Sequence, residues 1–310
     1  MRATRLAELE VRLAEGGLDL PAVRQIVEDA LAEDLGARGV LPAGVGAGVD
    51  VTSVATIAVD AVATGELIAR RDGVLAGVDV AAYTLGLVCA PAGPFQIDLL
   101  AGDGASVRRG DVLLRVEGNS RSVLRAERIA LNLITLMSGV ATATRAWADA
   151  LAETNARVRD SRKTVPGLRM LQKYAVRIGG GVNHRMSLAD AALIKDNHIV
   201  AAGGVVPAYR AVRAAFPGLG VQVEVTSAEQ ARDVIAAGAD DLLLDNMNPS
   251  DMALIVAEHA AADVRFEASG GLTLGSATEV AKSGVDFIAV GAITHSAPIL
   301  DIALDLVTKA

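Results

Sequence analysis

The spacing of hydrophobic and polar residues changes near residue 140. Before that point, short apolar runs alternate with glycine and aspartate, which is typical of antiparallel strands joined by tight turns. The clearest runs are residues 55–59, 65–70 and 104–118. We therefore expect a small antiparallel sheet in the first part of the chain. From residue 120 to residue 153 the apolar positions follow helical spacing, with Gly139 as the expected break.

Beyond residue 155 the pattern becomes a series of short apolar strands, each followed by a helix. The candidate strands are residues 156–160, 192–195, 221–225, 242–245, 264–268 and 287–290, and the candidate helices are residues 227–237, 249–260 and 274–282. Glu224, Asp245, Glu267 and Ala289 follow one another at intervals of 21 or 22 residues. A repeat of that length implies parallel strands with right-handed crossovers, as in an α/β barrel or a doubly wound sheet.

Polar residues at the strand ends favour the barrel. Lys195, Glu224 and Asp245 each end a candidate strand, and in a closed barrel such ends meet at one mouth. A doubly wound sheet would instead need a glycine-rich fingerprint after its first strand, and the sequence has none there. We expect an α/β protein in which residues 1–139 form an N-terminal α+β sheet domain and residues 140–310 form a TIM-like α/β barrel that need not be complete.

Composition excludes several classes of protein. The 310 residues, 52% of them hydrophobic, are enough to bury a core without disulfides or metals. The single cysteine, Cys89, can form neither an internal disulfide nor a thiolate zinc site, which favours the cytoplasm. A net charge of −8 argues against a nucleic-acid-binding surface. Glycines and prolines interrupt the longest uncharged run, residues 80–97, and the first residues lack an apolar signal core, so we expect no membrane segment.

The charge is distributed unevenly along the chain. Residues 159–198 contain 8 basic and 3 acidic side chains, which leaves 21 basic against 34 acidic in the other 270 residues. Arg169, Lys173 and Arg177 follow helical spacing and are explained by a solvated helix face. The remaining basic residues of interest lie at strand ends or in a glycine-rich loop, and they are Arg162, Lys163, His184, Arg185 and Lys195. For these we favour a site that binds phosphates or carboxylates.

Two acidic residues and two glycine-rich corners extend this candidate site. Glu224 and Asp245 end successive apolar strands, where a carboxylate needs a cation, a magnesium ion or ribose hydroxyls nearby. A structural ion pair explains either acid alone equally well. The corners follow the last two candidate strands, and they consist of Ser269, Gly270 and Gly271, and of Val290, Gly291 and Ala292. Backbone N–H groups at such corners are able to bind a phosphate.

The motifs of this region resemble those of the quinolinate phosphoribosyltransferase family. They are Ser-Arg-Lys-Thr-Val-Pro-Gly-Leu-Arg (161–169), Gly-Gly-Gly-Val-Asn-His-Arg (179–185), Leu-Ile-Lys-Asp-Asn-His (193–198), Leu-Leu-Leu-Asp-Asn-Met (242–247), Glu-Ala-Ser-Gly-Gly (267–271) and Val-Gly-Ala-Ile-Thr-His (290–295). Three N-terminal motifs agree as well, namely Glu-Asp-Leu-Gly (33–36), Asp-Val-Thr-Ser (50–53) and Glu-Arg-Ile-Ala-Leu-Asn (127–132). The resemblance runs in order through most of the chain.

The resemblance implies an activity and a set of roles. It implies conversion of quinolinate and 5-phosphoribosyl 1-pyrophosphate, with magnesium, into nicotinate mononucleotide, pyrophosphate and carbon dioxide. It also implies a homodimer in which Arg128 reaches the partner's site. Ser161, Arg162, Lys163, His184, Arg185 and Lys195 are then expected to bind the quinolinate carboxylates and the pyrophosphate. Glu224 and Asp245 are expected to lie near the ribose and the metal ion, and the glycine corners are expected to bind the 5-phosphate. The residues expected to be catalytic are Lys163, Lys195, Glu224 and Asp245.

Some positions depart from the family pattern or leave alternatives open. Ser161 stands where the family usually has threonine, which keeps the hydroxyl, and residues 37–48 resemble an insertion. His198 and His295 flank the motifs, and their roles stay open between structure and catalysis. Three other functions remain possible: a lyase that forms a Schiff base on Lys195, a relative associated with molybdate-transport genes, and an anion-binding barrel without catalysis.

Overall fold

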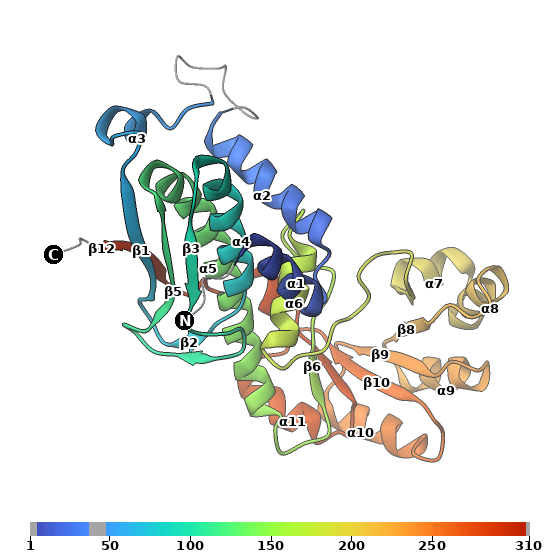
Figure 1. Ribbon diagram of the computed structural model, residues 1–310. Helices are drawn as coiled ribbons and strands as arrows, with labels where there is room; N and C mark the ends of the chain where they lie inside the picture. Colours follow the sequence, from blue (N-terminus) through green and yellow to red (C-terminus); the bar gives the residue numbers. More distant parts are fainter. Residues whose placement is uncertain (1–4, 37–47, 308–310) are drawn as a thin grey trace. The chain divides into compact units, whose positions relative to one another are not determined.

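The computed structural model describes residues 5–36 and 48–307, which form two compact units whose segments alternate along the chain (Figure 1). The first unit contains the described residues up to Thr142, then Pro166–Gly179, and the end of the chain from Ala297. The second unit contains Ala143–Val165 and Gly180–Ser296. The division into domains of residues 1–139 and 140–310 stays a prediction. Residues 37–47 of the suspected insertion lie outside the described residues.

The first unit is built on a four-stranded antiparallel sheet with the order β12-β1-β5-β3. Its strands are β1 (Val62–Ala69), β3 (Gln96–Leu99), β5 (Val112–Asn119) and β12 (Ile302–Val307), and a second, two-stranded sheet pairs β2 (Gly73–Val74) with β4 (Ser106–Val107). This confirms the expected antiparallel sheet. The expected strand at residues 55–59 is wrong, because α3 (Val51–Thr56) is a helix whose first turn is capped by the Asp50 carboxylate.

The first unit also contains helices, which account for most of the long uncharged run. The helices are α1 (Leu6–Glu15), α2 (Leu20–Asp34), α4 (Val78–Cys89), the 3-10 turn η1 (Ala90–Ala92) and α6 (Arg169–Ile178). The helix α4 packs on β3 and β5 and is buried along almost its whole length. Cys89 ends this helix, and burial raises the pKa of its thiol to about 11, so the thiol is not a nucleophile at neutral pH.

The long helix α5 (Ser120–Ala150) passes through Gly139 without the expected break. A Cβ atom at Gly139 would lie 2.2 Å from the carbonyl oxygen of Pro298. The glycine therefore lets the end of the chain approach the helix, and the expectation of a break was wrong. By length and composition α5 alone among the described helices is apolar enough to cross a membrane, yet 67% of its most apolar window is buried inside the protein. Burial of that kind also occurs in the core helices of proteins that cross no membrane.

The second unit contains the repeated strand-helix pattern. Its six parallel strands, in the order β6-β11-β10-β9-β8-β7, are β6 (Arg157–Arg159), β7 (Ala192–Ile194), β8 (Val221–Val225), β9 (Asp241–Asp245), β10 (Arg265–Ser269) and β11 (Phe287–Ala289). The first strand pairs with the last, as in a barrel, and Val182 forms a parallel bridge with Arg159 on the other side of β6. No pairing joins this bridge to β7 among the described residues, so the expected barrel is confirmed in an incomplete form.

The helices of the second unit follow the strands as the periodicity predicts. They are α7 (Asp196–Ala202), α8 (Val205–Ala215), α9 (Ala228–Ala236), α10 (Pro249–Glu258), the 3-10 turn η2 (Leu274–Ser276), α11 (Ala277–Ala281) and α12 (Ala292–His295). Side chains cap two of them at the N-terminus, because Ser227 and Asn248 each accept a hydrogen bond from the backbone N–H of the third residue of the helix. Figure 1 shows α8, α9 and α10 outside the strands, which leaves the carboxyl ends of the strands to form a site.

Candidate active site

A cavity of about 630 Å³ lies at the carboxyl ends of the parallel strands, wholly within the second unit. Thirteen of the residues predicted from the sequence line it, namely Ser161, Arg162, Lys163, His184, Arg185, Lys195, Asp245, Ser269, Gly270, Gly271, Val290, Gly291 and Ala292. Glu224 does not line the cavity but contacts Lys195, which does. Arg128 belongs to the first unit, where it lies exposed on α5.

The parallel strands explain why residues far apart in the sequence meet in this cavity. Asp245 is the last residue of β9 and Ser269 is the last residue of β10, and these two positions are paired in the sheet. Lys195 follows β7 directly, and Gly291 follows β11 after one intervening residue. Because every strand runs in the same direction, the residue that follows each strand faces the same end of the barrel.

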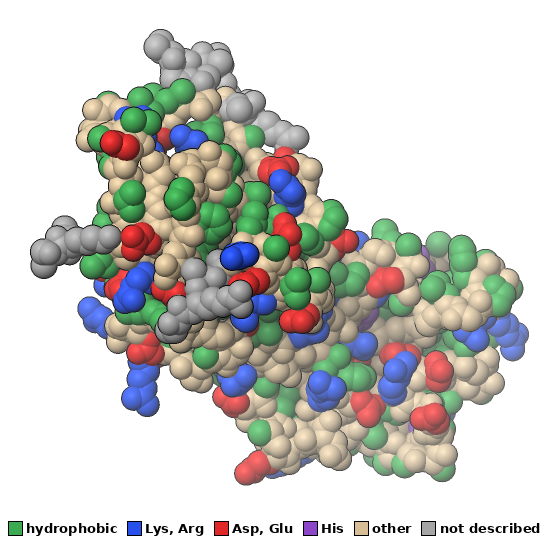
Figure 2. Space-filling model, in the orientation of Figure 1, with side chains coloured by type: hydrophobic (Ala, Val, Ile, Leu, Met, Phe, Trp, Pro, Cys, Tyr) green, Lys and Arg blue, Asp and Glu red, His purple; other side chains and the backbone are tan. Residues whose placement is uncertain are grey.

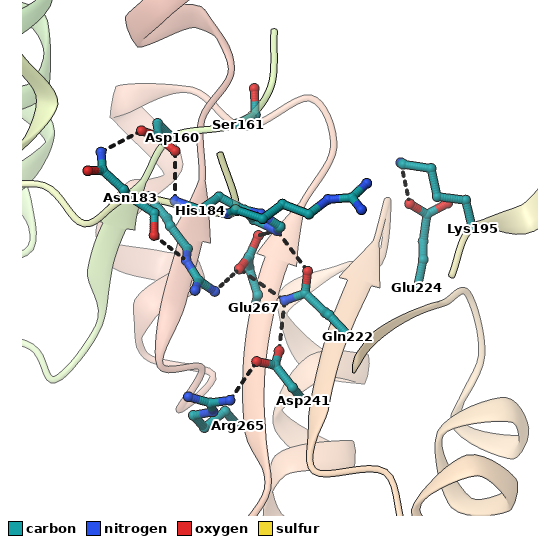
Figure 3. A network of polar contacts seen from close by, with 12 residues as sticks. Asp160, Ser161, Asn183, His184, Lys195, Gln222, Glu224, Asp241, Arg265 and Glu267 are labelled. Carbon is teal, nitrogen blue, oxygen red and sulfur yellow. Dashed lines mark hydrogen bonds and ion pairs between the residues drawn. The ribbon is translucent and has the colours of Figure 1, made fainter. Parts of the chain in front are cut away.

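Lys195 is held from both its backbone and its side chain. Its Nζ donates a hydrogen bond to Glu224 Oε2 over 2.7 Å, and 48% of the Lys195 side chain remains exposed (Figure 3). Its backbone N–H donates to Nδ1 of His198, which lies in the first turn of α7. His198 thus has a structural contact at the helix start and is not part of the cavity wall. The Glu224 carboxylate fixes the ammonium group of Lys195 near the cavity.

Asp160 shapes the loop that carries His184 and Arg185. Its side chain is fully buried at the end of β6. Its two oxygens accept hydrogen bonds of 2.7 Å each, one from the backbone N–H of His184 and one from Nδ2 of Asn183. The Arg185 guanidinium in turn donates to the carbonyl oxygen of Ala191 over 2.8 Å. Burial lowers the pKa of Arg185, and the charge of Arg162 acts in the same direction. An anion in the cavity would offset this repulsion.

A buried polar network underneath the cavity was not predicted from the sequence (Figure 3). Gln222 Nε2 donates to Asp241 Oδ1 over 2.8 Å and to Glu267 Oε2 over 3.1 Å. Arg159 donates to the same oxygen of Glu267 over 2.7 Å, and Arg265 donates to Asp241 over 2.8 Å. Burial raises the pKa of Asp241 against the opposing effect of the bond from Gln222. One sequence signal was available, because Gln222 interrupts the apolar strand Val-Gln-Val-Glu-Val.

The glycine corners are narrow where they approach other cavity residues. A Cβ atom at Gly270 would lie 2.2 Å from Oδ1 of Asn246, and Gly270 has a positive φ of 96°. A Cβ atom at Gly291 would lie 3.1 Å from the Lys163 side chain and 3.3 Å from His295. Glycine at these two positions therefore leaves room for the neighbouring side chains. The backbone at both corners is open to a ligand in the cavity.

Asn246 and His295, neither of which was assigned to the site, also line the cavity. Asn246 Nδ2 donates to Asp245 Oδ2 over 2.7 Å, and its backbone N–H donates to the carbonyl oxygen of Ser269. His295 lies 2.6 Å from Ser296 Oγ through its Nδ1. The sequence pattern could not assign Asn246, because a polar residue after a strand end is expected in any turn.

The cavity wall combines four cationic side chains, Arg162, Lys163, Arg185 and Lys195, with two open glycine corners. Guanidinium and ammonium groups bind phosphates and carboxylates, and backbone N–H groups at glycine corners bind phosphate. Acidic groups are present as well, since Asp245 lies in the wall. The arrangement suits a ligand with several anionic groups. The ligand should also have at least one group that a carboxylate binds, such as a hydroxyl that donates a hydrogen bond or a bound cation.

Comparisons with known proteins agree on one family. The model for the quinolinate phosphoribosyl transferase C-terminal domain matches residues 140–305, and the model for its N-terminal domain matches residues 50–138. The chain is 48% identical to the nicotinate-nucleotide pyrophosphorylase (carboxylating) of Mycobacterium leprae, over 93% of this chain and 98% of the relative. It is 40% identical to the probable enzyme of that name from Bacillus subtilis, over 78% and 82% of the two chains.

Solved structures show the same relationship. The nicotinate-nucleotide pyrophosphorylase from Francisella tularensis superposes with a TM-score of 0.83 at 37% identity, covering 92% of this chain and 96% of that one. NadC from Streptococcus pyogenes superposes with a TM-score of 0.84 at 34% identity, covering 94% and 99% of the two chains. The similarity therefore extends over both units of the fold.

Proposed function

Because the chain belongs to the quinolinate phosphoribosyltransferase family, we propose a division of tasks among its cavity residues for the reaction of that family. The chain is a decarboxylating phosphoribosyltransferase of NAD biosynthesis, and thus a pentosyltransferase. It converts quinolinate and 5-phosphoribosyl 1-pyrophosphate into nicotinate mononucleotide, pyrophosphate and carbon dioxide. The observation that supports the division of tasks is the group of four cationic side chains beside two glycine corners in one cavity.

The cationic side chains are assigned to the anionic groups of both substrates. Arg162 and Arg185 suit the planar carboxylates of quinolinate, because a guanidinium binds a carboxylate through two parallel hydrogen bonds. Lys163 and Lys195 are compact ammonium groups that suit the pyrophosphate. Ser161 adds a hydroxyl to the same wall. Negative charge grows on the pyrophosphate as its bond to the ribose breaks, and a well-placed donor contributes about 2 to 4 kcal/mol to such a transition state.

The two acidic residues and the two glycine corners are assigned to the phosphoribosyl group. Asp245 lies in the wall and Glu224 lies beside Lys195, where carboxylates accept hydrogen bonds from ribose hydroxyls and stabilise positive charge on the ribose. The corner of Ser269, Gly270 and Gly271 and the corner of Val290, Gly291 and Ala292 provide backbone N–H groups for the 5-phosphate. In this assignment the protein acts by positioning and electrostatics, without a covalent nucleophile.

We propose that magnesium enters the site together with the pyrophosphate. Within the described part of the chain, no group of three His, Cys, Asp or Glu side chains is able to hold a metal alone. Mg²⁺ is commonly bound by one or two carboxylates and by substrate phosphates. Asp245, in the cavity wall, fits such a donor set, and Glu224 is nearby through its contact with Lys195. Bound there, the ion would offset the charge on the leaving pyrophosphate.

We propose that the chain acts as a homodimer in which Arg128 reaches the partner's cavity. Arg128 is exposed on α5, and the family resemblance assigns it to the partner's site. An apolar surface supports the assembly. It is made up of the exposed side chains of Val51, Val54, Val59, Val62 and Val307, on or beside α3, β1 and β12. Figure 2 shows apolar side chains over this region, interspersed with charged ones. Exposed apolar surfaces often mark protein interfaces.

The reducing cytoplasm is the compartment that we propose for the reaction. Cysteine usage supports this proposal, since the chain has one cysteine and therefore no internal disulfide.

The proposed reaction is tested by mixing the protein with quinolinate, 5-phosphoribosyl 1-pyrophosphate and magnesium chloride. We expect nicotinate mononucleotide and carbon dioxide in equal amounts, and no product after magnesium is removed with a chelator. Arg185→Ala should raise the KM for quinolinate while the circular dichroism spectrum stays unchanged. Reaction of nicotinic acid in place of quinolinate would contradict the assignment of the guanidinium groups. A borohydride-trapped adduct on Lys195 would instead indicate the lyase.

A further inference from the structure

We infer that Gln222 is a positioning residue that holds His184 as a neutral imidazole, so that the arginine and lysine side chains alone supply positive charge to the anionic substrates. This inference rests on the proposed function for its meaning, but it is carried by hydrogen bonds within the protein. His184 lines the cavity, and Gln222 lies beneath it on β8 (Figure 3).

The Nδ1 atom of His184 is fixed as a hydrogen-bond acceptor. The backbone N–H of Arg185 donates to this atom over 2.7 Å. A backbone N–H group has no lone pair, so it is always the donor. Nδ1 must therefore carry its lone pair and no proton. An imidazolium, which has a proton on both ring nitrogens, would place two hydrogens against each other at this contact.

The Nε2 atom of His184 is fixed as a donor by the orientation of Gln222. Nε2 lies 2.9 Å from Oε1 of Gln222. The amide nitrogen of Gln222 donates to Asp241 Oδ1 and to Glu267 Oε2, and both carboxylate oxygens act as acceptors. A flipped amide would point its oxygen at two carboxylates, so the orientation is determined. The Gln222 oxygen must then face His184 and accept the proton of Nε2.

The charges around the imidazole are of both signs, so the two hydrogen bonds of the ring decide its protonation state. The charged side chains of the surrounding elements are Asp160, Arg162, Lys163, Arg185, Lys195, Glu224, Asp241, Asp245, Glu267, Arg159 and Arg265. Oε1 of Glu267 lies 3.8 Å from Nε2, which is within ion-pair distance of a protonated ring but beyond hydrogen-bond length. Its other oxygen already accepts bonds from Arg159 and Gln222.

Burial adds to this preference for the neutral form. The His184 side chain is 11% exposed and Gln222 is 6% exposed. A second proton would place a further positive charge in a poorly hydrated position of a cavity that Arg162 and Arg185 also line, and desolvation opposes that charge. The network thus keeps the ring in one orientation and one protonation state, and His184 gives the quinolinate pocket a fixed shape rather than a charge.

The protonation state is measured directly on the full-length protein labelled with ¹⁵N-histidine. The chain has four histidines, and the signals of His184 are assigned by their loss in His184→Asn. We expect one protonated and one unprotonated ring nitrogen, with no titration between about pH 8 and pH 5.5, although an ordinary histidine titrates near pH 6.5. Two protonated nitrogens at pH 7, or titration at the ordinary pH, would overturn the inference.

The role of Gln222 is tested with two variants and a matched control. Gln222→Met keeps the length of the side chain but cannot accept the Nε2 proton. We expect kcat/KM for quinolinate to fall about tenfold, the cost of a lost buried hydrogen bond, while KM for 5-phosphoribosyl 1-pyrophosphate changes less than about twofold. Gln222→Glu replaces the amide nitrogen with an oxygen that faces Asp241 and Glu267, so this network must take up a proton, and kcat/KM for quinolinate should fall and should change more steeply with pH than in the native protein.

Gln230→Met is the control, because Gln230 also hydrogen-bonds within the second unit but contacts Thr226 away from the cavity. A lower melting temperature in Gln222→Met with an unchanged His184 spectrum and an unchanged KM for quinolinate would show a merely structural role and contradict the inference. The ¹⁵N spectrum does not depend on turnover. A neutral His184 without product formation would reject the proposed function alone, and product formation with a charged His184 would reject this inference alone.

Discussion

At the residue scale, Asn246 combines an unusual backbone with a contact to Asp245. Its φ is +54°, and among the residues that the structure describes no other non-glycine residue has a positive φ. For residues with a side chain this conformation costs about 1 to 2 kcal/mol, less for asparagine than for most. Such strain is concentrated at functional sites. Here the conformation lets the Asn246 side chain hold one oxygen of Asp245 while its Oδ1 fills the space above Gly270.

Two substitutions of Asn246 separate the strain from the contact. Asn246→Gly and Asn246→Ala both remove the hydrogen bond to Asp245, so both should raise the KM for 5-phosphoribosyl 1-pyrophosphate several-fold. Only Asn246→Ala should also lower the free energy of unfolding, by about 1 kcal/mol, because alanine is strained at positive φ and glycine is not. Steady-state kinetics and urea unfolding of both variants measure the two effects. Equal stability of the two variants would show that the backbone is not strained.

The residues of the site that could be predicted are those that follow an apolar strand. Lys195 and Asp245 stand out because a charge directly after a buried strand has few structural explanations. Gln222 and Asp241 lie within or at the start of a strand and contribute to a network whose partners come from β6 and β10. Their importance depends on which strands are neighbours, and the sequence pattern does not contain that information.

At the scale of the elements, packing around Gly139 outweighs the low helix propensity of glycine. Glycine is less favourable than alanine in a helix interior by about 1 kcal/mol, which is why a break was expected. The helix continues because the segment at Pro298 and Ile299 packs directly against this position. The strand β12, which follows that segment, was missed for a related reason, because its partner strand β1 lies far from it in the sequence. Its Asp305 also forms an ion pair with Arg70, which is 235 residues earlier.

Replacing Gly139 tests this packing. Gly139→Ala should decrease the free energy of unfolding by about 1 to 3 kcal/mol despite the better helix propensity, because the new Cβ atom meets the backbone of Pro298. Gly86→Ala in α4 is the matched control. There a Cβ atom would approach only the flexible side chains of Leu6 and Phe95 at 3.2 to 3.4 Å, so the change should stay within about 1 kcal/mol of zero. Thermal and urea unfolding measure both. A stabilised Gly139→Ala would contradict the packing argument.

At the scale of the whole molecule, net charge is a poor guide to the ligand. The chain carries −8 overall, yet its residues 159–198 carry 8 basic against 3 acidic side chains. Four of those basic residues lie in the cavity wall. The acidic surface elsewhere does not prevent a local positive potential that attracts anionic substrates. The sequence pattern revealed this uneven distribution of charge. At the level of the sequence, the homodimer was predicted only from the family resemblance.

The proposed exchange of Arg128 between subunits predicts complementation. Arg128→Ala and Lys195→Ala should each be nearly inactive as homodimers. After the two are unfolded and refolded together in equal amounts, half of the dimers are mixed, and each mixed dimer has one site with both native residues. About a quarter of the native activity should therefore return. Mixing without refolding is the control. No recovery in refolded mixtures shown to contain mixed dimers would mean that Arg128 does not act across an interface.

The pairing of β12 with β1 has a consequence for the order in which the protein is made. The ribosome releases β1 early, but β12, the strand that completes its sheet, emerges only after every strand of the second unit. The second unit ends at Ser296, so its strands are all available before that closing strand is. The sheet of the first unit is thus completed only after the second unit has been synthesised. Until then one edge of β1 has no partner strand and is able to pair with a wrong one. Loss of β12 would therefore damage the beginning of the chain more than its middle.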